Sequence, residues 1–464
     1  MSFASKHSNN PMNKAISRRQ LIRLVGIGSA GMALAACAPA AAPAAPAATT
    51  APGQEPAPTT APAAAAGGNL RVLVCCATPS EEPLRVKFNT DFQTANPGVT
   101  VTQEAPPAGQ NYFEKLQTLL AANTMPDVFD MWEGYVQPYA QNGALMALDD
   151  LIKGDAKIKA DDVLPVVQPA QSYEGKSYAF IYGFMPGPVS IYYNVDQFKE
   201  AGVAEPTDEW TWTDFRDAAL KLTKSTNGNV ERWGANFDNW FVNWQYWIWS
   251  NGGDIFNADS TKTTITDPKA AEAVQFWYDL VNKDKVAPGT SDAQGIGSMT
   301  KAFGAGQISM RLGNYWDFGD IKEAKDINWK AVLSPKSLTG DRVWYMHLGC
   351  WSISSQSQLA STAWAYSRDF VLQRPIDSVT PYVPPLKSLL PTFNKPEFEQ
   401  LGYKPLVDIV QQPGKLRIPG AGAKFDKISS LIQAELDLAF IGKKTVAEAM
   451  AAAEPAVNEE LARA

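Results

Sequence analysis

The chain has little of the residue types on which most catalytic and metal sites depend. Its 464 residues include two histidines, His7 and His347, and four cysteines without a metal-ligand spacing. It contains no GxSxG, HExxH or paired Cys/His motif. A formal net charge of −7 leaves no basic excess for nucleic acid. We therefore expect no metal, no cofactor and no nucleic-acid partner.

The N-terminus has the composition of an export signal. Arg18 and Arg19 precede a short apolar run from Leu24, and the sequence Leu-Ala-Ala-Cys ends at Cys37. The paired arginines resemble a bacterial twin-arginine signal, and Leu-Ala-Ala-Cys resembles a lipobox, which implies cleavage before Cys37 and lipid on its thiol. A membrane-spanning anchor is less favoured, because a span needs about 20 apolar residues. Residues 1–36 are therefore predicted to be a lipoprotein signal peptide, which places the mature protein outside the cytoplasm on a bacterial membrane.

A stretch of low complexity follows the signal. After its first cysteine, the segment 37–68 is almost wholly Ala, Pro, Thr and Gly. Such a segment cannot bury a core, so it is predicted to be an extended, semi-rigid tether. The globular body is expected to begin near Asn69.

The three cysteines of the body are Cys75, Cys76 and Cys350. Export permits a bridge from Cys350 to one of the adjacent pair. A twin-arginine substrate, however, folds before export in a reducing compartment. Buried free thiols are therefore the favoured interpretation.

The body begins with alternating strand and helix patterns, which indicate an α/β fold with an open, doubly wound sheet. Ligands bind such sheets beyond the carboxyl ends of the strands, here residues 77–82, 105–112 and 132–135. A second unit is expected from residue 189 onward, and residues 345–354 form a long apolar crossing. The expected strands are 70–76, 99–103, 127–131, 189–193, 308–312 and 329–333, and the main helices are 82–95, 112–122, 214–223, 359–372, 426–440 and 446–461.

Residues 232–256 hold five of the fourteen tryptophans. Trp240, Trp244 and Trp247 share one stripe of a predicted helix, with Asp238 or Asn239 as the N-cap and glycines after residue 251 as the stop. Large residues at helical spacing usually pack in a core. The surplus of indoles also allows the first turn to face a ligand with flat faces.

Several short motifs occur in a characteristic order along the body: NYFEKL at 111–116, MPDV at 125–128, YAQNGAL at 139–145, IYYN at 191–194, NGGD at 251–254 and FGAGQISM at 303–310. Behind a lipoprotein signal, this order resembles the family 1 extracellular solute-binding proteins of bacterial ATP-driven importers, which include maltose-binding proteins. The resemblance covers nearly all of the body. It implies a two-lobed, type II periplasmic-binding-protein fold with a central cleft and a hinge.

The resemblance also suggests where the lobes divide. Lobe 1 is expected to comprise 69–182 and 351–400, and lobe 2 to comprise 183–350 and 401–464. The two crossings should lie near 180–188 and 347–351, where glycine and proline redirect the chain. Closure of the hinge around a ligand is the expected motion.

A sugar offers an apolar face and a rim of hydroxyls, so its site needs aromatic plates and fixed polar partners. Trp316 follows the 308–312 strand, where the family places an aromatic plate, and is the first choice. Trp240 is second, with Trp244 at the border of the site. Glu133 follows the third strand, where maltose-binding relatives carry an acidic ligand-binding residue. The further candidates are Trp132, Tyr135, Thr78, Glu81, Asn239, Asn314, Trp351 and Arg417; His347 is taken as structural.

The resemblance implies a lipid-anchored, monomeric receptor that captures a carbohydrate, in particular an oligosaccharide, and delivers it to an ABC permease without catalysing a reaction. One alternative is an anchored carbohydrate-active enzyme, because tryptophans and acids also form glycosidase sites. Another is a receptor for a peptide or a polyamine. Glu81, Glu82, Glu104 and Glu133 keep the polyamine alternative open.

Overall fold

The computed structural model describes residues 67–75, 81–106, 112–377, 382–393, 395–396, 412, 414–420 and 422–463. The predicted signal peptide, Cys37, most of the predicted tether and Thr78 lie outside these residues. Residues 59–464 belong to one compact unit. No helix within the described part is long and apolar enough to cross a membrane.

The first sheet contains the predicted β-α-β-α-β alternation. Its three parallel strands have the order β3-β1-β2. Leu70, Val72 and Phe129 are fully buried, as expected for parallel strands covered on both faces. The elements are β1 (Gly68–Leu73), α2 (Glu82–Ala95), β2 (Val99–Glu104), α3 (Tyr112–Ala121) and β3 (Val128–Met131).

The second sheet is mixed, with the order β11-β7-β10-β9-β8. β10 and β9 are parallel, whereas β7 is antiparallel to both of its neighbours and β8 is antiparallel to β9. Its strands are β7 (Ser190–Asn194), β8 (Lys224–Thr226), β9 (Asn229–Phe237), β10 (Ile308–Gly313) and β11 (Trp329–Leu333). The helices between these strands are α7 (Val195–Ala201), α8 (Trp212–Leu222), α9 (Phe241–Ser250), α10 (Pro268–Asn282), α11 (Thr290–Ile296), α12 (Met299–Gly304) and α13 (Asp317–Ile321).

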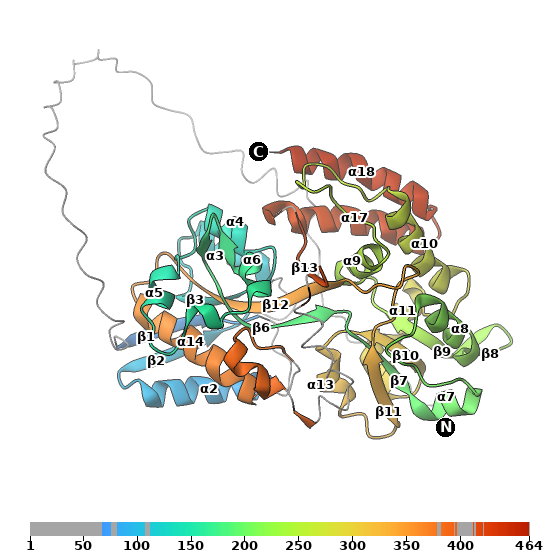
Figure 1. Cartoon of the computed structure of the whole chain (residues 1–464), viewed down its shortest axis with the longest axis horizontal. Coiled ribbons are helices and arrows are strands. Elements are labelled where there is room, and N and C mark those ends of the chain that lie inside the picture. The colour runs from blue at the N-terminus through green and yellow to red at the C-terminus, as the bar shows by residue number, and fades with distance from the viewer. Residues whose placement is uncertain are drawn as a thin grey trace, which may run out of the picture. The chain divides into compact units, whose positions relative to one another are not determined.

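Two long strands, β6 (Phe180–Gly187) and β12 (Trp344–Ile353), form the predicted crossings and pair antiparallel (Figure 1). β12 also pairs with β3 and with β13 (Leu416–Arg417). Gly183 and Gly349 face each other in this ladder. A Cβ on Gly183 would lie 2.8 Å from the Tyr382 Cβ, and one on Gly349 would lie 2.1 Å from the Tyr182 hydroxyl oxygen. Only glycine allows both tyrosines to lie against the crossing strands.

We expect Gly349→Ala to lower the free energy of unfolding by about 1–3 kcal/mol, because the new methyl group must displace Tyr182. Gly295→Ala is the matched control. A Cβ at Gly295, inside α11, meets nothing within 4 Å. Alanine there should be neutral or stabilise by about 0.4–1 kcal/mol. Urea unfolding of both variants measures the difference, and equal unfolding midpoints would contradict the close approach.

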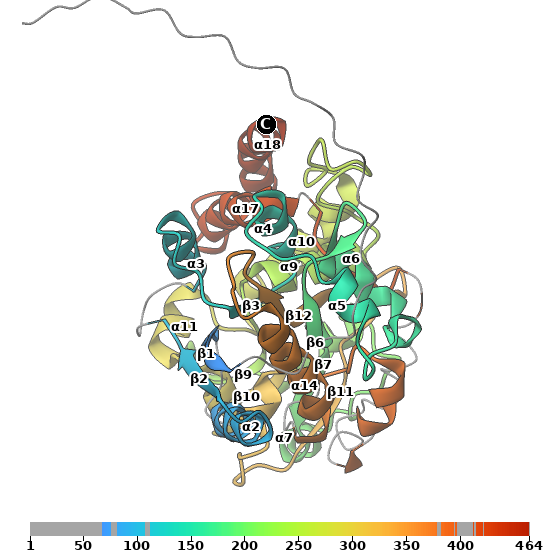
Figure 2. The same cartoon turned by 90° about the vertical axis from the view of Figure 1, so that its left-hand side faces the viewer.

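The C-terminal helices are α14 (Ala360–Asp377), α17 (Phe425–Phe440) and α18 (Val446–Ala462), close to their predicted bounds. Figures 1 and 2 both show α17 and α18 side by side, and Phe440 contacts Trp277 of α10 with ring centroids 4.5 Å apart. The shorter elements are α4 (Val136–Gln141), α5 (Asp149–Lys153), α6 (Gln168–Gln171), β4 (Ser172–Tyr173) and β5 (Lys176–Ser177), with 3-10 turns at Ala160–Asp162, Pro165–Val167, Lys387–Phe393 and Gly422–Lys424.

The tryptophan helix α9 differs from its prediction at the start. Its N-cap is Trp240, whose backbone is extended, and not Asp238 or Asn239. The stop is as predicted, with Asn251 as the C-cap and Gly252 at a φ of 79°. Trp244 and Trp247 are fully buried, and Trp247 packs against Trp212 at a centroid distance of 4.6 Å. Most of the indole surplus is therefore core.

The two described cysteines differ. Cys350 is a buried free thiol, as predicted, and its Sγ donates to the carbonyl of Met131 at 3.2 Å. Burial raises the pKa of this thiol well above its usual value. Cys75 is disulfide-bonded, so the expectation of a free thiol is wrong for this residue. Its partner lies outside the described residues.

Candidate ligand-binding site

A cavity of about 320 Å³ opens where strands of both sheets end against the crossing strands. Its aromatic lining comes from separate parts of the chain. Trp132 follows β3, Trp240 precedes α9 and Trp316 follows β10. Three tyrosines complete this lining, namely Tyr182, Tyr315 and Tyr382. The sequence had placed Trp316, Trp240, Trp132 and Glu81 at the ligand, and the structure brings all four to this cavity.

Trp240 and Trp316 form one wall. Their ring centroids are 5.9 Å apart and the rings are inclined at 65°. The ring of His347 lies beside both. Its centroid is 5.1 Å from that of Trp316, 6.4 Å from that of Trp240 and 6.2 Å from that of Trp132. Each indole is partly exposed. The arrangement leaves apolar ring surface available to a ligand in the cavity.

Glu133 lies behind His347 and does not line the cavity. Its Oε1 is 2.7 Å from His347 Nδ1, and its Oε2 accepts the backbone N–H of Leu348 at 2.9 Å. With both oxygens bonded and 3% of the residue exposed, Glu133 orients the imidazole. Of these two residues, His347 lines the cavity and Glu133, the expected acidic ligand residue, does not.

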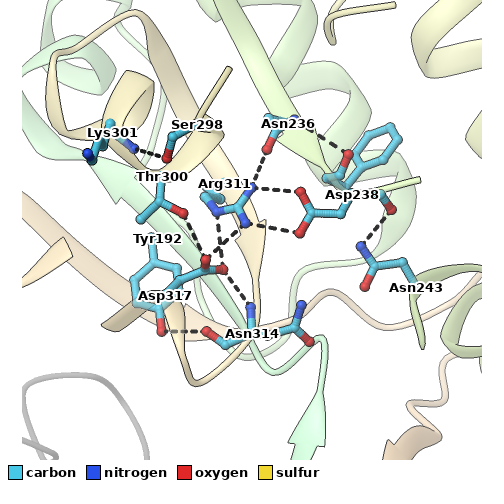
Figure 3. A network of polar contacts seen from close by, with 11 residues as sticks. Tyr192, Asn236, Asp238, Asn243, Ser298, Thr300, Lys301, Arg311, Asn314 and Asp317 are labelled. Atoms are coloured by element: carbon cyan, nitrogen blue, oxygen red, sulfur yellow. Dashed lines mark hydrogen bonds and ion pairs between the residues drawn. The ribbon is translucent and has the colours of Figure 1, made fainter. Parts of the chain in front are cut away.

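A buried arginine ties together the turns that carry Trp240 and Trp316. Arg311, on β10, donates from Nη2 to Asp317 Oδ1 and to Asp238 Oδ2, each at 3.0 Å. Asp317 directly follows Trp316, and Asp238 lies two residues before Trp240. Asn236 also accepts from this guanidinium (Figure 3).

Asp317 extends this cluster into the surrounding backbone. It accepts the Asn314 N–H at 2.9 Å and the Thr300 hydroxyl at 2.8 Å (Figure 3). On the other side, Asn243 donates to the carbonyl of Asp238 at 2.8 Å. Burial lowers the pKa of Arg311, but the charges of Asp317 and Asp238 outweigh it and leave a net rise. One permanently charged guanidinium thus orients both tryptophan turns.

The floor of the cavity is charged. Arg374 Nη2 donates to Glu81 Oε2 at 3.0 Å, and Arg85 Nη1 lies 3.4 Å from Asp130 Oδ2. Tyr182 donates its hydroxyl to Asp130 Oδ1 at 3.0 Å. Burial raises the pKa of the Asp130 carboxyl, and the opposing charge of Arg85 reduces that rise. The floor therefore combines two guanidinium groups with two carboxylates.

Comparison with known proteins agrees with this architecture. A sequence model of the bacterial extracellular solute-binding proteins matches residues 77–361, more than half of the chain. The chain belongs to this family. It is similar to the maltotriose-binding protein of Pyrococcus abyssi, with 22% identity over 270 residues, 57% of this chain and 54% of that protein.

Solved structures share the two-lobed fold. An ABC substrate-binding protein from Listeria monocytogenes, in complex with cycloalternan, has a TM-score of 0.75 and 24% identity. A receptor of Streptomyces glaucescens, solved without ligand and with acarbose, has a TM-score of 0.71 and 20% identity. Each similarity covers 85% of this chain and 99% of the other. The fold class expected from the sequence is confirmed.

Three predicted ligand residues of this solute-binding protein make contacts away from the cavity. Asn239 donates from Nδ2 to Asp437 Oδ1 at 2.9 Å. The hydroxyl of Tyr135 donates to Asp426 at 2.6 Å, and its ring stacks on that of Phe113. Arg417 pairs with Asp254 at 2.6 Å. Each of these side chains fastens neighbouring segments together.

Three other candidates are fully buried: Trp244, Trp351 and Asn314. Trp244 donates from its indole to Gln433 at 3.0 Å. Trp351 lies under the floor, with its ring centroid 5.4 Å from the Arg85 guanidinium. None of the three lines the cavity. Their prediction was wrong because periodicity and strand ends indicate which part of the chain is near the site, but not where a side chain points.

The sequence reasoning missed Arg85, Arg374 and all three tyrosines of the cavity, and it took His347 as structural. A signal existed for Arg85. It is buried with Asn89 and Phe92 on one face of α2, at helical spacing. A charged residue on such a face is rarely buried without a partner. No comparable pattern marked Arg374.

Proposed function

We propose that this solute-binding protein captures a carbohydrate in the cavity and delivers it to the permease of an ABC importer. The observation that carries the proposal is the inclined pair of Trp240 and Trp316 beside His347. Such a pair offers stacking surface to a sugar ring, and an oriented imidazole offers a polar contact to a hydroxyl. The carbohydrates bound by similar proteins, cycloalternan and acarbose, support this class of ligand.

A polyamine or an enzymatic reaction fits the cavity less well. A polyamine site needs carboxylates that are free to accept hydrogen bonds from the ammonium groups. Glu133 is engaged by His347, Glu81 by Arg374, and Asp130 by Tyr182. A glycosidase needs one carboxylic acid and one free carboxylate across the sugar. Since the carboxylates around this cavity already accept hydrogen bonds from protein donors, a binding protein that catalyses no reaction fits the site better.

The proposal includes the predicted lobes and the predicted membrane attachment. Lobe 1 would comprise 69–182 and 351–400, and lobe 2 would comprise 183–350 and 401–464, with β6 and β12 as the hinge. A single cavity is lined by Trp132, from the proposed lobe 1, and by Trp316, from the proposed lobe 2, which supports closure around a ligand. Ligand would favour the closed state by its differential affinity, which a permease can sense. Lipid on Cys37 would hold this monomeric receptor at the membrane.

A thermal-shift screen tests the proposal. The protein from residue 69 onward should gain thermal stability with one class of oligosaccharide, because a ligand at 100 times its dissociation constant adds about 2.7 kcal/mol to folding stability. Polyamines and short peptides serve as the comparison set. A shift with spermidine but with no carbohydrate would overturn the proposal. Sugar cleavage at stoichiometric protein would establish an enzyme instead.

A further inference from the structure

The floor of the cavity has hydrogen-bond donors that the described part of the protein does not use. Arg85 and Arg374 both line it and are 5% and 7% exposed. Nε and Nη1 of each guanidinium have no hydrogen-bond partner among the described residues. The approach of Arg85 to Asp130 at 3.4 Å is an ion pair without hydrogen-bond geometry.

The nearby acceptors, in contrast, are occupied. Asp130 accepts from the Cys75 N–H at 2.8 Å and from the Tyr182 hydroxyl at 3.0 Å, and it is only 1% exposed. Glu81 accepts from Arg374. Behind His347, Glu133 accepts from the imidazole and from a backbone N–H. Among the described residues, the carboxylates around the floor therefore have protein donors, whereas Nε and Nη1 of both guanidinium groups have no acceptor.

Stacking orients these donors. The Arg374 guanidinium lies 3.6 Å from the ring centroid of Tyr382 and 4.7 Å from that of Tyr182. Arg85 lies 5.8 Å from the centroid of Tyr182. Aromatic rings contact the face of a guanidinium, whereas its N–H groups point outward in the plane. The tyrosines thus hold Arg374 without using up its edge donors.

This imbalance discriminates between ligand groups. A buried donor without an acceptor has lost its hydrogen bonds to water without replacement, and a ligand oxygen can supply the missing acceptor. A hydroxyl brings its own proton, which needs an acceptor that this floor does not readily offer. A carboxylate brings about four lone-pair sites and no proton, and it matches the planar fork of arginine.

We propose that the carbohydrate is acidic, and that Arg374 and Arg85 receive the carboxylate of a uronic acid unit while Trp240 and Trp316 receive a ring face. This inference rests on the proposed function and names the substrate class of the same site. Arg85 and Arg374 are balanced in formal charge by Asp130 and Glu81. The selection therefore comes from unused hydrogen-bond donors and not from an excess of positive charge.

Matched sugar pairs test the inference on the unmodified protein. Galacturonate and glucuronate di- and trisaccharides are titrated beside the neutral galactose and glucose oligomers of the same linkage. One uronate should bind at least about tenfold more tightly than its neutral counterpart. A neutral oligomer that binds equally well or better would overturn this inference alone. Silence of every carbohydrate would overturn the proposed function as well.

Arg374→Gln supplies the second arm, with Arg368→Gln as its control on the same helix. Arg368 pairs with Asp155 at 2.9 Å and with the adjacent Asp369, and it does not line the cavity. Arg374→Gln should weaken uronate binding at least about tenfold and binding of the neutral oligomer less than about threefold, whereas Arg368→Gln should change neither. Equal losses for both sugars would show a structural role for Arg374 and contradict the inference.

Discussion

Arg311→Met should lower the free energy of unfolding by about 3–5 kcal/mol, because removing one partner of a buried ion pair leaves the other charge uncompensated. The side chains of Arg311 and Asp317 are each 4% exposed. Of its donors among the described residues, Asp317 would keep the Asn314 N–H and the Thr300 hydroxyl. Denaturant unfolding followed by far-UV circular dichroism measures this loss.

Two controls separate the effect of breaking the buried Arg311–Asp317 ion pair from the effect of removing any positive charge. Lys87 and Asp91 form an exposed ion pair, each side chain 59% exposed, so Lys87→Met should cost only about 0.3–0.5 kcal/mol. In Arg311→Met/Asp317→Asn, the buried uncompensated charge of Asp317 is gone, so the double variant should lose less than the sum of the single variants. A loss below about 1 kcal/mol in Arg311→Met would contradict the cluster as the support of the wall.

Trp316→Ala should weaken carbohydrate binding at least about tenfold, or about 1.4 kcal/mol, because it removes one of the two inclined plates. The free energy of unfolding should change less than the free energy of binding, since Trp316 is only partly buried. Tryptophan fluorescence titration with the carbohydrate found by screening gives the affinity.

Two variants bracket the effect of Trp316. Trp316→Phe keeps an aromatic face and should retain most of the affinity. Trp210→Ala removes another partly buried indole, which packs on Phe198 and does not line the cavity, so its affinity should match that of the unmodified protein. Equal affinities of Trp316→Ala and the unmodified protein would show that Trp316 only covers the core.

The first sheet was predictable because its signals are local. An apolar run such as that of β1 and helical spacing such as that of α2 depend on neighbouring residues alone. The second sheet required more. β10 lies between parallel β9 and antiparallel β7, and its partners are distant in the sequence: Ile308 pairs with Trp233, 75 positions away, and Met310 pairs with Tyr193, 117 positions away. The predicted crossing segments coincide with β6 and β12, because glycine and proline mark a change of chain direction within the local sequence.

The candidate site was predictable only in part, for a physical reason. Trp240 and Trp316 stand at element boundaries, where strand ends gather in this fold class. Trp244 lies one helical turn further along α9 and points into the core. Arg374 reaches the cavity from the end of α14 through tertiary packing that no local pattern encodes. Glu133 follows the third strand as expected, but it bonds His347, and of the two residues only His347 lines the cavity.

A crystal structure with the best carbohydrate from the screen is the most direct test of the central claim. We predict one sugar ring against Trp316 and Trp240, within hydrogen-bonding distance of His347, with residues of both sheets contacting the ligand. A carbohydrate bound elsewhere, for example in the groove beside Asp426 and Asp437 of α17, with Trp316 untouched, would contradict the account.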